Sequence, residues 1–104
     1  MSARRKKRLD WHADALEELA ESIAWYAELN PAAARRMKAA IFKAAESLVA
    51  APVSVPGRPG ILTGTRELPI GHGVPFTLVF VRDDKTGDCI VYHSQHQASE
   101  YFNR

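Results

Sequence analysis

The stretch Gly57-Arg58-Pro59-Gly60-Ile61-Leu62-Thr63-Gly64-Thr65-Arg66-Glu67-Leu68 divides the chain into two halves of different character. Helical patterns precede it, and short, strand-like apolar runs follow it. Glycine permits positive φ and the close approach of another surface, and arginine offers a planar, charged fork of donors that fits phosphate or carboxylate. The stretch is therefore either a binding loop between scaffold elements or a surface loop whose arginines form ordinary ion pairs.

The segment after Asp10 has the pattern of an amphipathic helix. Asp10 is a suitable N-cap, and acidic residues occupy the early turns, as the helix dipole favours. Trp25 falls on the side opposite to the apolar stripe, so it is either left for a partner or, as we expect for a helix between a helix and a sheet, packed on a second neighbour. The stripe has helical spacing and consists of Leu16, Leu19, Ile23, Tyr26 and Ala27.

A second helix is expected from Pro31 to about Ala50. Asn30 is a good cap, proline suits the first helical position, and Ala51-Pro52 ends the helix. Because the connection is very short, the two helices should form an antiparallel hairpin, with the acidic first helix paired with the basic second. The stripe of the second helix consists of Ala34, Met37, Ile41, Ala44 and Leu48.

Three strands are expected after the quoted stretch. Thr65 to Ile70 is the first, and Cys89 to His93 or Gln95 is the last. Phe76 to Val81 is apolar on both alternations, which is typical of a central strand covered on both faces. A further strand is expected over Arg5 to Trp11, so that residues 1–8 are a basic arm or part of an edge strand. The resulting order is β–α–α–β–β–β, an α+β fold in which a helical hairpin packs on a small, mostly antiparallel sheet.

Composition limits the class of protein. With 104 residues, 46 % hydrophobic and 25 % charged, the chain should be a single soluble domain over residues 1–104. No apolar run approaches the roughly 20 residues of a membrane span, and the five basic residues at positions 4–8 are not followed by the apolar segment of a secretory signal. The single cysteine, Cys89, suits a reducing compartment, so we expect a cytoplasmic protein. No metal-ligand spacing or cofactor motif is present, so no metal or cofactor is expected.

Chemistry-bearing residues gather in two places, the quoted stretch and the run from Tyr92 to Phe102. If Arg66 begins one strand and His93 ends another in the same sheet, both face one concave surface. Such a surface is suited either to general acid/base cleavage of RNA, with arginine stabilising the phosphorane charge, or to protein binding.

The chain resembles the RelE/ParE toxins of bacterial type II toxin–antitoxin modules over nearly its whole length. The resemblance lies in the helix start Asn30-Pro31, the Gly57-Arg58-Pro59-Gly60 turn, the Gly64-Thr65-Arg66-Glu67-Leu68 box and the Pro75-Phe76-Thr77-Leu78-Val79-Phe80 strand. It implies the β–α–α–β–β–β fold, and it implies growth inhibition and plasmid stabilisation as biological roles.

The family divides by target, and this chain is more similar to ParE-like toxins, which act on DNA gyrase without established nuclease chemistry. RelE-like toxins are ribosome-dependent mRNA endonucleases with basic residues in the strand that here reads Thr77 to Val81, where none occurs before Arg82. The sequence departs from the common ParE ending at Gln95-His96-Gln97. The target-binding residues implied by the resemblance are Arg58, Arg66, His93, His96 and Tyr101. In the alternative RelE-like ribonuclease, the catalytic set is Arg66, His93, His96 and Tyr101.

A toxin of this family also implies a partner. A cognate ParD-like antitoxin would fold a disordered C-terminal segment onto the toxin in a hetero-oligomer, and operator DNA would be bound only through the antitoxin. The residues expected to dock an acidic, apolar antitoxin segment are Trp25, Arg35, Arg36 and Lys38. A second alternative is a non-toxic nucleic-acid-binding domain that uses residues 4–8 and the basic second helix.

Overall fold

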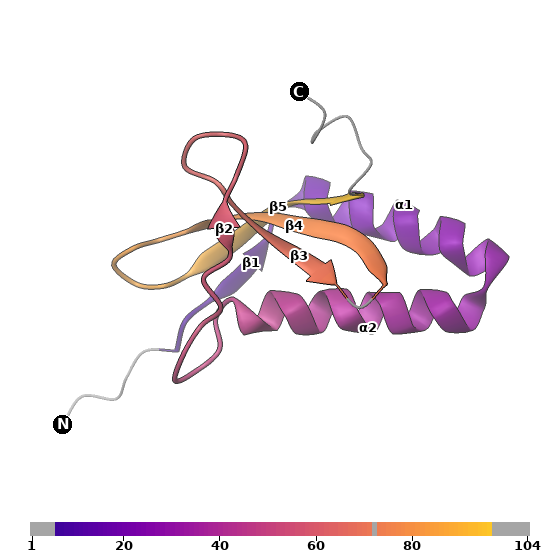
Figure 1. Cartoon of the computed structure of the whole chain (residues 1–104), viewed down its shortest axis with the longest axis horizontal. Helices are drawn as coiled ribbons and strands as arrows, with labels where there is room; N and C mark the ends of the chain where they lie inside the picture. Colours follow the sequence, from indigo (N-terminus) through magenta and orange to yellow (C-terminus); the bar gives the residue numbers. More distant parts are fainter. Residues whose placement is uncertain (1–5, 72, 97–104) are drawn as a thin grey trace.

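Two helices lie side by side against one face of a five-stranded sheet in the computed structural model of the chain, which describes residues 6–71 and 73–96 (Figure 1). The expected α+β fold with a helical hairpin is therefore confirmed. The elements in chain order are β1 (Leu9–Trp11), α1 (Ala13–Leu29), α2 (Pro31–Ser47), β2 (Arg58–Pro59), β3 (Arg66–Gly71), β4 (Val74–Arg82) and β5 (Cys89–His96).

The strands are ordered β1-β5-β4-β3-β2, with β1 parallel to β5 and every other pair antiparallel. The central position of β4 is confirmed, since all five residues from Phe76 to Phe80 are buried. The two-residue β2 was not expected from the sequence. It pairs Arg58 with Glu67 and so folds the quoted stretch back onto β3.

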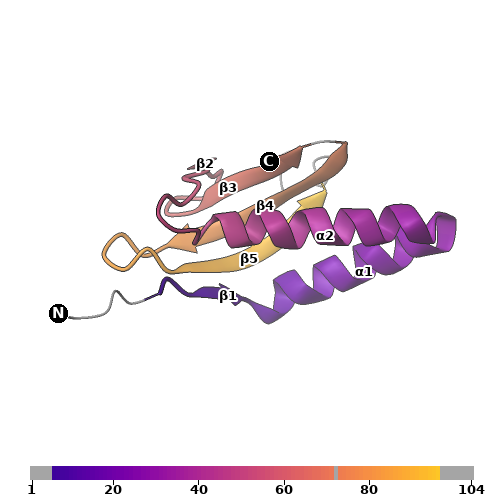
Figure 2. The same ribbon diagram turned by 90° about the horizontal axis from the view of Figure 1, so that it is seen from below.

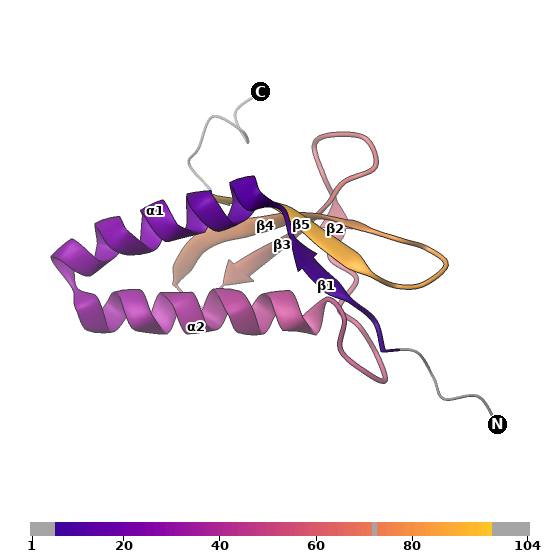
Figure 3. The same cartoon turned by 180° about the vertical axis from the view of Figure 1, so that it is seen from behind.

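The N-terminal strand is shorter than expected and lies at the edge of the sheet, where it leads directly into α1 (Figure 3). Residues 6–8 have no regular secondary structure, and residues 1–5 lie outside the described part of the chain. The expected cap at Asp10 is wrong because Asp10 belongs to β1 and pairs with Ile90. The backbone N–H of His12 adds a further hydrogen bond to this strand pair by donating to the carbonyl of Val91. The Nδ1 atom of His12 caps α1 by accepting a hydrogen bond from the N–H of Asp14.

The second helix begins as expected. Asn30 caps it through a 3.1 Å hydrogen bond from the N–H of Ala33, and Pro31 is its first residue. The helix ends at Ser47 rather than near Ala50. At the other end of the chain, β5 continues to His96, and the short tail expected from Ala98 onward lies outside the described residues.

The helices lie along one face of the sheet (Figure 2), and side chains from both layers form the hydrophobic core. Two expectations for α1 are wrong. Leu16 is 45 % exposed, so Ala15 takes its place in the core, and Trp25 is 58 % exposed rather than packed on a second neighbour. The largest buried core side chains are Leu19, Met37, Ile41, Leu48, Phe76, Leu78, Phe80 and Val91.

The opposite charges of the two helices do not pair. The helices pair as expected, but over the described ranges no ion pair joins a carboxylate of α1 to a cation of α2. The hairpin therefore presents separate acidic and basic surfaces to solvent. This separation of charge bears on which partners each surface can bind.

Candidate functional site

Both arginines of the stretch Gly57–Leu68 are engaged by groups of the stretch itself or by the adjacent Pro56. Arg66 donates from Nε to the carbonyl of Pro56 at 2.8 Å and from a terminal nitrogen to the carbonyl of Gly57 at 3.1 Å. Arg58 pairs with the buried carboxylate of Glu67 at 3.3 Å, and the other oxygen of this carboxylate accepts from the N–H of Ile61. These contacts stabilise the loop, which agrees with the alternative of a surface loop whose arginines form ordinary contacts.

A third arginine, Arg82, performs a similar task at the end of β4. Its guanidinium donates to the carbonyl of Leu48 at 3.0 Å, of Val55 at 2.6 Å and of Pro56 at 3.0 Å. Arg82 and Arg66 therefore hold the connection from α2 to β2 between them. The sequence singles out Arg82 only as the first cation after an apolar strand, which does not predict this role.

The sheet register does not bring Arg66 and His93 together. Arg66 pairs with Phe80, which faces the helices, whereas His93 pairs with Val79, the neighbouring residue of β4. Because successive residues of a strand project to opposite faces, Arg66 and His93 belong to rows on opposite sides of the sheet. The expected common surface is therefore wrong, and Tyr101 lies outside the described residues.

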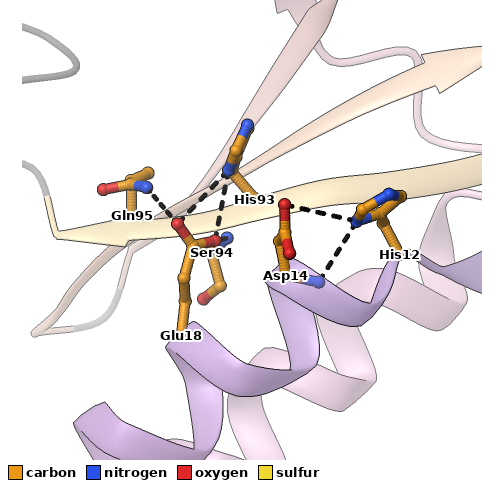
Figure 4. A network of polar contacts seen from close by, with 6 residues as sticks. All are labelled: His12, Asp14, Glu18, His93, Ser94 and Gln95. Atoms are coloured by element: carbon orange, nitrogen blue, oxygen red, sulfur yellow. Dashed lines mark hydrogen bonds and ion pairs between the residues drawn. The ribbon is translucent and has the colours of Figure 1, made fainter.

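His93 belongs instead to a polar cluster centred on Glu18 of α1 (Figure 4). The Nδ1 atom of His93 lies 3.2 Å from each carboxylate oxygen of Glu18, and the N–H of Ser94 donates to Oε1 at 3.2 Å. The side-chain amide of Gln95 donates to Oε2. Pairing with β1 stops at Val91, so Glu18 satisfies a backbone donor that would otherwise be left at an open sheet edge.

Glu18→Ala should lower the free energy of unfolding by about 2 kcal/mol, because Ser94 and its neighbours lose a charged acceptor. Urea denaturation measures the change. Glu17→Ala is the matched control, since Glu17 is exposed and has no hydrogen bond or ion pair to another described residue. Equal stability of the two variants would contradict the role given to Glu18.

The other histidine of β5, His96, lines a cavity of about 370 Å3 between α1 and the sheet. Trp25 lies on the α1 side of this cavity and packs edge-to-face against Tyr26, with ring centroids 4.8 Å apart. The ring centroid of Tyr26 lies 6.2 Å from that of Phe76, and the ring centroid of Phe76 lies 5.3 Å from that of His96. An unbroken series of ring contacts therefore runs from exposed Trp25 to the end of β5.

A separate apolar groove of about 390 Å3 lies between α1 and α2. Trp25 follows Leu16, which lines this groove, by nine positions, or about two and a half helical turns, so the two side chains project from opposite sides of α1. The lining residues are Leu16, Leu19, Ala20, Ile23, Ala24, Lys38 and Phe42.

The four residues expected to bind the antitoxin are distributed over different surfaces. Lys38 lines the groove between the helices, and Trp25 lines the cavity beside β5. Arg36 lines a third cavity, of about 430 Å3, against the turn between β3 and β4. Arg35 is exposed on α2, one turn before Lys38. A single short peptide would not cover all four positions.

Reactive and metal-binding chemistry is sparse in the described ranges. Residues 6–71 and 73–96 contain no group of three or more side chains able to hold a metal ion, and none of their helices has the length and apolarity to cross a membrane. Cys89 opens β5 and is fully buried. Burial raises the pKa of its thiol, which disfavours the reactive thiolate.

Comparison with known families matches residues 9–101 to the model described as the ParE toxin of type II toxin-antitoxin system, parDE. The chain belongs to the ParE toxin family. A solved structure described as the chromosomal ParDE system from P. aeruginosa is similar, with a TM-score of 0.73 and 22 % identity over 88 % of this chain and 96 % of that one. No curated protein gives a significant match.

Family membership decides between the toxin and the nucleic-acid-binding domain as interpretations of the sequence. The protein is a ParE-type toxin of a type II toxin–antitoxin system, and the alternative of a non-toxic nucleic-acid-binding domain is set aside. The similar solved structure agrees with the fold described above.

Proposed function

We propose that this ParE-type toxin acts by binding DNA gyrase, without nuclease chemistry, and that a ParD-like antitoxin neutralises it in a hetero-oligomer. The observation that favours gyrase over the ribosome is the placement of Arg66. A RelE-like mechanism that uses Arg66 and His93 needs both side chains at one phosphate. Here the guanidinium of Arg66 is bound to two backbone carbonyls, on the row opposite to that of His93.

Purified toxin distinguishes the two targets directly. With gyrase and supercoilable plasmid, it should block supercoiling or trap cleaved DNA, and with translating ribosomes it should leave mRNA intact. Cleavage of mRNA in the ribosomal A site, with unaffected gyrase, would establish the RelE-like alternative instead. Both targets are in the cytoplasm, and we propose that the protein acts there.

The groove between α1 and α2 is the site that we propose for the antitoxin. It is apolar along its length, and Lys38 at its side, with Arg35 one turn away, suits an acidic amphipathic segment. The antitoxin would fold on binding, and operator DNA would be bound through the antitoxin rather than by the toxin.

Substitution at the rim tests this site without disturbing the core. Leu16→Glu places a carboxylate at a position that is 45 % exposed, and it should weaken antitoxin binding by roughly tenfold or more while the fold is retained. Isothermal titration calorimetry with the purified antitoxin measures the affinity. Glu17→Ala, on the neighbouring solvent-facing side of α1, is the control. Unchanged affinity of the Leu16 variant would move the antitoxin to another surface.

A further inference from the structure

We propose that the toxin contacts its target through the flank of α1 that bears Trp25, and that the target contributes a basic segment with an apolar side chain that enters the cavity beside Trp25. The inference rests on the proposed function, a toxin that acts by binding a protein. The Trp25 flank is defined here by Glu18, Glu21, Ser22, Trp25, Glu28 and Leu29.

Large apolar side chains are exposed on this flank. Trp25 is 58 % exposed and Leu29 is 68 % exposed, and a spacing of four residues places them one above the other on the helix. Together with Glu18 and Ser22 they form a single stripe along α1. Tryptophan in a position that can be fully desolvated is among the most frequent sources of binding energy in protein interfaces.

The aromatic part of the flank is fixed before a partner arrives. The indole of Trp25 packs edge-to-face on Tyr26, which in turn contacts buried Phe76, and His96 completes the wall of the 370 Å3 cavity. Ring contacts of this kind restrict the rotamers of Trp25. Binding then costs less side-chain entropy than it would at a flexible surface.

The charge of the flank selects the chemistry of the partner. Glu21 and Glu28 are exposed on either side of Trp25, α1 contains no basic residue, and no cation of α2 pairs with its carboxylates in the described ranges. An acidic surface around an apolar anchor attracts a basic segment and repels an acidic one. The acidic antitoxin segment proposed above is therefore directed to the groove beside Lys38.

The manner of binding follows from Glu18. At the edge of β5 next to this flank, the carboxylate of Glu18 already accepts hydrogen bonds from the backbone N–H of Ser94 and from the side-chain amide of Gln95. This edge is therefore not open to strand addition at Ser94. A partner on the Trp25 flank binds through side chains in the cavity and through charge.

The test compares gyrase inhibition with antitoxin binding for variants of the flank. Trp25→Ala should raise the toxin concentration needed for half-inhibition of supercoiling by roughly tenfold or more. The double charge reversal Glu21→Lys/Glu28→Lys should also weaken inhibition, by an amount that shrinks as salt increases. Affinity for the antitoxin should stay within about twofold of wild type in both variants. Urea unfolding confirms that each variant is folded.

Val53→Ala is the matched control, because Val53 is a 78 % exposed apolar residue outside the flank. Inhibition equal to wild type by both flank variants would overturn the inference while leaving gyrase as the target. Parallel loss of antitoxin affinity would also overturn it, since the flank would then bind the antitoxin. If the wild-type toxin itself leaves gyrase unaffected, the proposed function and this inference fail together.

Discussion

Gly57→Ala should lower the free energy of unfolding by about 3 kcal/mol, among the largest effects of any single-methyl change in this protein. Gly57 has φ of +71°, which costs an L residue about 1 kcal/mol. A Cβ atom there would also lie 2.8 Å from the carbonyl oxygen of Glu67 and 2.9 Å from Cζ of Phe80. Neither neighbour can withdraw easily, because Glu67 is paired within the sheet and Phe80 is fully buried.

Gly64→Ala separates the two contributions. Gly64 has φ of +85° but nothing within 4 Å of the position of its Cβ, so this variant should lose only about 1 kcal/mol. Urea unfolding of both proteins gives the comparison. Equal losses would show that the loop moves to accommodate the methyl group, and that the close approach at Gly57 is not rigid.

The sequence predicts the parts of the fold that depend on local chemistry. Asn30-Pro31 starts a helix because the cap and the proline act on their own backbone, and the apolar run from Phe76 predicts a central strand from its two-sided pattern. The first cap was misplaced because the choice between Asp10 and His12 depends on how far β1 pairs with β5. That pairing joins residues about 80 positions apart and leaves no mark near Asp10.

The candidate site was predicted less well for a related reason. Arg66 stands out in the sequence by its residue type, but its partners in the structure are carbonyls, which any residue provides and no sequence pattern reveals. Glu18 was overlooked because it is one of several glutamates in α1, and only the end of β1 makes its position special. Trp25 can be recognised from the sequence alone because it lies on the side of the helix opposite to the apolar stripe, and this position follows from residue spacing.

The second large effect is expected at Arg82. Arg82→Ala should lower the free energy of unfolding by about 3 kcal/mol, because three carbonyls lose a charged donor and only the more exposed ones regain water. Arg82→Lys should recover only part of this loss, since a single ammonium cannot reproduce the two arms of the guanidinium. The exposed cation Lys43 has no hydrogen bond or ion pair to another described residue, so Lys43→Ala should stay within about 0.5 kcal/mol of wild type.

Hydrogen exchange would show whether Arg82 acts on the loop itself. The N–H of Val55 donates to the carbonyl of Ser47 at 2.9 Å, and this bond closes the turn that Arg82 holds from the other side. In Arg82→Ala, the protection of the Val55 amide should fall by more than that of amides in the centre of β4, because the connection opens without global unfolding. A uniform loss across the protein would mean that Arg82 supports the sheet as a whole, and the assignment of Arg66 and Arg82 as joint supports of this connection would be wrong.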